Sequence, residues 1–246
     1  LFSVTQTGSA ITEMTDGSAA LLGDLTVVNG QFNVATNTLS IGGSLEASGA
    51  TLYTASGTLL FNSNDTGEFV DIGNNVLYNA VFANASGGWT VFSATTTNNF
   101  FVTNANTFTL AAGESLVVGG VFQNLVGGPA TTWTDTSLVL DGANAYTINS
   151  KATPSESYAT VIITENSDIR AWNSVAATTT ISSSSSLYSQ DHAGIDGSLY
   201  IYGDFTIGTT TENWSYATDF DGAILTGANR RGVTVSHAEN ATTTLS

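Results

Sequence analysis

A short apolar run that recurs at intervals of about 21 residues constrains the fold more than any other feature of this chain. The runs centre on Leu39, Leu59, Val81 and Val102 and then on Leu116, Leu138 and Val161. Within the runs stand Leu, Val and Ile, which suit strands, and between them stand Asn, Gly, Ser and Asp, which favour turns. An interval of about 20 residues is typical of one coil of a parallel β-helix, in which each strand pairs with its equivalent in the next coil.

A longer period is superimposed on the short one. The four tryptophans are Trp89, Trp133, Trp172 and Trp214, and alternate members of this series are separated by nearly equal intervals. The similar segments 38–43, 115–120 and 198–203 also follow one another at nearly equal intervals. These intervals predict a super-repeat of roughly 80 residues, or four coils.

The repeat suggests a division of the chain. Residues 1–20 match it poorly and are expected to form an N-terminal cap. Residues 21–246 are expected to form a single β-solenoid with three copies of the super-repeat: 21–88, 89–171 and 172–246. Because they recur at coil spacing, Leu138, Val161 and Leu199 are predicted to point into one continuous core.

A length irregularity in the third copy favours coils over other all-β folds. The segment from Asn144 to Thr178 is longer than the matching segment from Asn229 to Thr242. The difference is roughly 20 residues, which is the length of one coil. A solenoid can lose a whole coil because each coil contacts only its neighbours, whereas a sandwich or barrel would lose its pairing.

Charge and composition exclude several classes of partner. The chain has 4 Lys and Arg against 20 Asp and Glu, a net charge of -16, so we expect no nucleic-acid partner. It has no cysteine, which excludes disulfides and thiolate metal sites. No apolar stretch reaches the roughly 18 residues of a membrane-spanning helix, so no membrane insertion is expected.

Two matching segments carry a resemblance to a known class of proteins. Leu-Gly-Asp-Leu-Thr-Val at 22–27 and Tyr-Gly-Asp-Phe-Thr-Ile at 202–207 resemble the repeats of bacterial cell-surface β-helix proteins, which are adhesin-like, filamentous-haemagglutinin-like or autotransporter-passenger-like. The resemblance implies an all-β fold, a right-handed parallel β-helix, with an extracellular or cell-surface location. It carries no catalytic residues.

The candidate catalytic and metal-binding residues form weak patterns. His192 and His237 do not occupy equivalent repeat positions and lack zinc-ligand spacing, so activity is not expected to depend on them. Asp219 and Asp221 flank Phe220 and would share one face of a strand. They are interpreted as solvated carboxylates or as a weak calcium site, and no other cofactor is expected. The alternative is an acidic pair like those that polysaccharide-cleaving β-helices use.

The candidate ligand and glycan sites also have two interpretations each. Trp89 and Trp172 share a repeat position, where they either pack in the core or present flat rings on which sugars stack. Four Asn-x-Ser/Thr sequons are candidate glycosylation sites, or chance matches in a chain rich in Asn and Thr: Asn64, Asn84, Asn213 and Asn240.

The sequence thus favours a non-catalytic structural module of a surface protein, such as a stalk, fibre subunit or surface-layer element. A carbohydrate-binding adhesin is the first alternative, with glycans as partners, and a β-helical polysaccharide lyase or hydrolase is the second. The final segment, 241–246, repeats a segment from early in a copy and contains neither charge nor proline. It predicts that a further coil follows, either in the same chain or by end-to-end stacking of a neighbouring copy.

Overall fold

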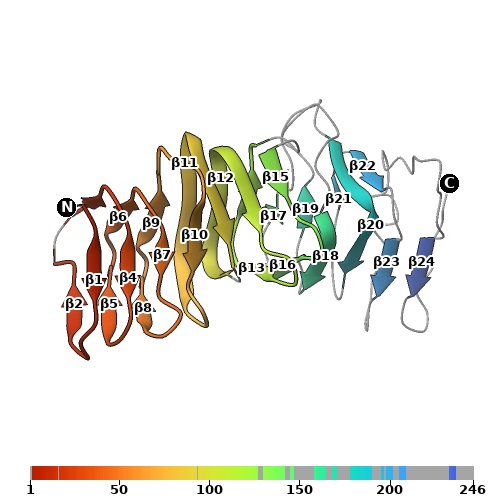
Figure 1. Ribbon diagram of the computed structural model, residues 1–246. Coiled ribbons are helices and arrows are strands. Elements are labelled where there is room, and N and C mark those ends of the chain that lie inside the picture. Colours follow the sequence, from red (N-terminus) through yellow and green to blue (C-terminus); the bar gives the residue numbers. More distant parts are fainter. Residues whose placement is uncertain are drawn as a thin grey trace.

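The computed structural model shows stacked parallel coils that run in chain order from β1 at one end to β24 at the other (Figure 1). It describes residues 2–15, 17–92, 94–126, 130–141, 145–146, 158–164, 168–170, 178–189, 195–196, 198–201, 205–208 and 233–236, with side-chain environments up to residue 140. The fold is all-β, and each coil takes about 21 residues. The predicted β-solenoid and its coil length are therefore confirmed.

The strands are short where one face of a coil is built alone and long where the chain runs on around a corner. Their bounds are β1 Val4–Gln6, β2 Ile11–Glu13, β3 Ala19–Leu21, β4 Leu25–Val27, β5 Gln31–Asn33, β6 Thr38–Ile41, β7 Leu45–Glu46, β8 Thr51–Tyr53, β9 Thr58–Phe61, β10 Glu68–Asp71, β11 Val76–Val91, β12 Ala94–Leu110, β13 Ser115–Val118, β14 Phe122–Asn124, β15 Thr131–Thr132, β16 Ser137–Asp141, β17 Ala145–Tyr146, β18 Tyr158–Thr164, β19 Asp168–Arg170, β20 Thr178–Ser189, β21 Ile195–Asp196, β22 Ser198–Ile201, β23 Phe205–Gly208 and β24 Val233–Ser236.

Parallel ladders give the described coils three faces. Face 1 consists of β1, β4, β7, β10, the ends of β11 and β12, and β15. Face 2 consists of a separate three-stranded sheet, β2, β5 and β8, and then of the starts of β11 and β12 with β13, β16 and β18. The side chain of Asn75 bridges the two parts by accepting a hydrogen bond from the N–H of Leu52. Face 3 consists of β3, β6, β9, the middles of β11 and β12, and β14.

The strands alternate between core and surface because successive side chains of a strand point to opposite sides. In β6, Leu39 and Ile41 are buried, whereas Thr38 and Ser40 are partly exposed. The pairing places Leu39 beside Leu59 and Ile41 beside Phe61 in the next coil. Apolar side chains therefore stack on apolar side chains along the axis and form one core.

Aromatic rings fill the core in the middle of the stack. Phe82 is the centre of this group, with ring centroids 4.5 Å from Phe61, 5.4 Å from Trp89, 5.4 Å from Phe100 and 5.1 Å from Phe108. Rings at these distances gain favourable edge and stacking contacts in addition to their burial.

The coil that contains β9 is longer than its neighbours. The interval from Leu45 to its partner Val70 exceeds the interval from Leu25 to its partner Leu45. The additional length lies in the turn 62–67 between β9 and β10, at the corner between faces 3 and 1. The carboxylate of Glu68 anchors this turn by accepting hydrogen bonds from the hydroxyls of Ser44 at 2.6 Å and Ser63 at 3.1 Å.

The structure corrects part of the predicted super-repeat. The matching segments 38–43 and 115–120 lie on different faces, since Leu39 belongs to face 3 and Leu116 pairs with Leu138 on face 2. The interval between these two segments is therefore not a whole number of coils. A strand of alternating apolar residues followed by two glycines can form part of any of the three faces. The two segments therefore match in sequence although they lie on different faces.

The predicted core positions have different outcomes. Leu138 is buried and pairs with Val161, as expected for adjacent coils. Val161 pairs in turn with Leu187. Leu199 pairs instead with Thr179, in a different ladder from the one that contains Leu138 and Val161. The side-chain environments beyond residue 140 lie outside the described set. The N-terminal segment 1–20, expected as a cap, contributes β1, β2 and most of β3 to the stack.

Candidate functional site

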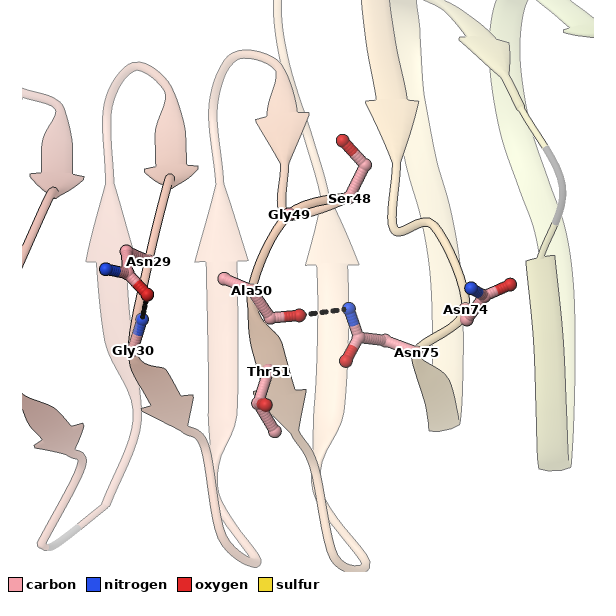
Figure 2. A pocket seen from close by; sticks show the side chains of 8 residues that line it. All are labelled: Asn29, Gly30, Ser48, Gly49, Ala50, Thr51, Asn74 and Asn75. Carbon is pink, nitrogen blue, oxygen red and sulfur yellow. Dashed lines mark hydrogen bonds between the residues drawn. The ribbon is translucent and has the colours of Figure 1, made fainter. Parts of the chain in front are cut away.

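A shallow polar groove crosses three successive coils at the corner between faces 1 and 2. Its volume is about 410 Å³. Figure 2 shows the residues that line it: Asn29, Gly30, Ser48, Gly49, Ala50, Thr51, Asn74 and Asn75. Each coil contributes the turn that follows its face 1 strand, and Thr51 begins β8 on face 2.

Small residues make this corner hollow. Gly73 has φ +54°, and a Cβ added there would lie 2.8 Å from the Cα of Ser48 in the preceding coil. Gly30 has φ +81°, a left-handed conformation that glycine adopts without the steric cost of a side chain. The turns of adjacent coils therefore pack closely, and no bulky side chain fills the space above them.

The side chain of Asn75 fixes the floor of the groove. Its Nδ2 donates to the carbonyl oxygens of Ile72 at 2.7 Å and of Ala47 and Ala50 at 3.0 Å each. Its Oδ1 accepts from the backbone N–H of Leu52 at 2.8 Å. The bond to Ala50 is visible in Figure 2. One amide thus ties two coils together and holds both turns in place.

Three groups on the rim remain available to a ligand. The side chains of Asn74 and Thr51 are exposed and have no hydrogen bond within the described part of the chain. Asn29 accepts from the N–H of Gly30 at 2.8 Å through Oδ1, and its Nδ2 has no hydrogen bond to any residue that the structure describes (Figure 2). The rim therefore offers neutral donors and acceptors side by side.

Two carboxylates lie next to the groove. Glu46 and Asp71 are partners in the register of face 1. Glu46 Oε1 accepts hydrogen bonds from the N–H and hydroxyl of Ser48, and Asp71 Oδ1 accepts from the N–H of Gly73 at 2.9 Å. These carboxylates stabilise the turns of the groove and make its surroundings negative. Among the described residues, no group of three or more His, Cys, Asp or Glu side chains is placed to hold a metal ion.

An exposed aromatic ring lies close to the groove. Tyr53 stands two positions after Thr51 on β8, so both side chains point outward from face 2. The side chain of Tyr53 is 51% exposed. Its ring is therefore available to a ligand that extends from the groove along β8.

The tryptophans predicted as sugar platforms require a correction. Trp89 is buried with 1% of its surface exposed, and its ring packs edge-on against Phe82. It presents no face to a ligand, so the core-packing interpretation holds for it. A Cβ added to Gly87 would overlap the Trp89 ring, so this glycine provides the space for the indole. Trp172 lies outside the described residues.

The first two sequons lie together in the stack. Asn64 is exposed, whereas Asn84 is half-buried and donates from Nδ2 to Asn64 Oδ1 at 2.9 Å and to the carbonyl oxygen of Asn62 at 3.0 Å. The nitrogen that would carry a glycan on Asn84 is thus already bonded. The remaining candidates lie outside the described residues: Asn213, Asn240, Asp219, Asp221, His192 and His237.

Sequence reasoning missed the groove, although a local signal was present. The dipeptides Asn29-Gly30, Ser48-Gly49 and Asn74-Asn75 each follow a face 1 strand and consist of turn-forming residues. Only the register of the coils shows that the three turns are adjacent. Among the described residues, no helix is long and apolar enough to span a membrane. Comparisons with protein-family models, curated proteins and solved structures found no match.

Proposed function

We propose that this chain is a non-catalytic structural module of an extracellular or cell-surface protein, serving as a stalk, fibre subunit or surface-layer element. The observation that carries the proposal is the continuous face 1 ladder, in which Val4, Leu25, Leu45 and Val70 pair in register from coil to coil. Each added coil extends such a stack by about 4.8 Å. Repetition of one unit therefore produces length and stiffness.

The first coil supports assembly by stacking. Thr12 occupies the inward position that pairs with buried Phe32, yet its side chain is exposed. Val4 is likewise only half-buried, whereas its partner Leu25 is fully buried. These inward positions of the first coil are thus less covered than their partners in the second coil. A further coil, from the same chain or from a neighbouring copy, would cover these positions and pair with the exposed strand edges.

A stacking test follows from the open position. The 246-residue chain is expected to form elongated particles whose mass rises with concentration, as measured by light scattering and electron microscopy. Thr12→Lys places a charge over the core end and should reduce this association at least tenfold. Thr26→Lys is the matched control, because Thr26 lies on the outward side of face 1 and should leave association unchanged. Compact monomers at every concentration would contradict the proposal.

A further inference from the structure

We propose that the groove at the corner between faces 1 and 2 binds a neutral oligosaccharide, with Tyr53 as the platform on which one sugar ring stacks. The proposal goes beyond the structural role and does not depend on it, because the groove lies on the side of the stack and not at its end. The volume of the groove, about 410 Å³, is within the range of roughly 300–1,000 Å³ that is usual for small-ligand sites.

The chemistry of the rim matches sugar hydroxyls. Each hydroxyl both donates and accepts hydrogen bonds. The amide of Asn74 offers a donor and an acceptor, the hydroxyl of Thr51 can act as either, and Asn29 offers its Nδ2. All three groups face solvent before binding, so their hydrogen bonds to water can be exchanged for hydrogen bonds to a sugar.

The aromatic ring supplies the second half of sugar recognition. One face of a pyranose consists mostly of C–H groups and can pack flat on an aromatic ring, whose π face is slightly negative. Tyr53 is half-exposed and follows Thr51 on the same outward row of β8. A chain of sugar units could therefore place one unit in the groove and the next on the ring. The buried Trp89 cannot perform this role.

Charge selects the class of sugar. Glu46 and Asp71 adjoin the groove, and both accept hydrogen bonds from residues of its turns. Both carboxylates are bonded to turns that line the groove, so their negative charge disfavours an anion bound there. The net charge of -16 acts in the same direction. Neutral oligosaccharides are therefore favoured over those that contain uronic or sialic acids.

Rigidity favours binding without rearrangement. The four hydrogen bonds of Asn75 hold the turns that carry Ser48, Asn74 and Thr51. A site that is already ordered loses little conformational entropy when a ligand binds. The floor of the groove consequently presents its polar groups in a fixed arrangement.

The test uses the labelled 246-residue chain on an array of neutral and acidic oligosaccharides, followed by calorimetric titration with the neutral oligosaccharide that gives the strongest signal. Binding to neutral members and not to uronic-acid or sialylated members is expected. Tyr53→Ala should weaken the titrated affinity about three- to tenfold, a loss of the size expected for an aromatic contact. Asn74→Asp should also weaken it, because the change removes the hydrogen-bond donor of the amide.

Phe69→Ala is the matched control. Phe69 is an outward-facing aromatic residue of face 1 that is 38% exposed and does not line the groove. This variant should bind like the parent chain, and all variants should keep the parent circular dichroism spectrum. The proposal is overturned if no neutral oligosaccharide binds at millimolar concentration, if acidic sugars bind better, or if Tyr53→Ala and Asn74→Asp bind as tightly as the parent. None of these results would affect the stacking test of the Thr12→Lys variant.

Discussion

Phe82→Ala should be among the most damaging single substitutions in the described core. Phe82 is fully buried and contacts four other rings, with centroid distances from 4.5 to 5.4 Å. Truncation of a buried Phe to Ala typically costs about 3–5 kcal/mol. Each favourable ring pair adds about 0.5–1.5 kcal/mol, although the pairs share one side chain and do not sum. We therefore expect a loss near the upper limit of the range, about 5 kcal/mol.

Guanidinium unfolding, followed by tryptophan fluorescence, would measure the change in the free energy of unfolding. Trp89, one of four tryptophans in the chain, packs against Phe82, so part of the fluorescence signal reports on this region. Because coils contact only their neighbours, hydrogen exchange should show the largest loss of protection in β9, β11 and β12. Phe69→Ala is the control and should change stability by less than about 1 kcal/mol, since its side chain is partly exposed. A loss of less than about 1 kcal/mol for Phe82→Ala, with unchanged exchange in these strands, would refute the ring arrangement and with it the register of face 3.

Two further substitutions test the groove floor and the face 2 ladder. Asn75→Ala removes four hydrogen bonds and leaves the N–H of Leu52 without its partner, so we expect a loss of about 2–3 kcal/mol in thermal unfolding, whereas Asn74→Ala should have almost no effect. An equal melting temperature for both variants would show that the amide of Asn75 does not hold the corner. Leu138→Ala should cost about 2–5 kcal/mol because its side chain is buried between coils, and Val139→Ala on the outward side should cost much less. Equal effects at these two positions would contradict the inward orientation of Leu138.

The coil could be predicted from the sequence because its signal is local and repeated. Leu39 and Leu59 are one coil length apart, each lies within an alternating strand, and each is followed by turn residues. The structure pairs them directly. Both the strands and the coil length can therefore be recognised without knowing which distant residues are in contact.

The assignment of faces could not be predicted in this way. The three faces of a coil use the same apolar alternation, so the segments 38–43 and 115–120 match in sequence although they lie on different faces. The burial of Trp89 was equally undetermined, because its position depends on Phe82 from face 3 and on the space beside Gly87. The groove required three turns from successive coils to be aligned, and the long coil between Leu45 and Val70 obscures that alignment in the sequence.

The turn 62–67 shows how such a stack can change its surface without changing its core. The coil is longer at this corner, yet Leu45 and Val70 still pair on face 1, and Leu59 and Ala80 still pair on face 3. The added length projects sideways and leaves the ladders in phase. Substitutions in the strands are therefore limited by the packing of the core, whereas insertions at such corners are limited by what the loop contacts outside the stack. A lineage of such proteins can diversify its exterior loop by loop, while the axial repeat that sets its reach remains constant.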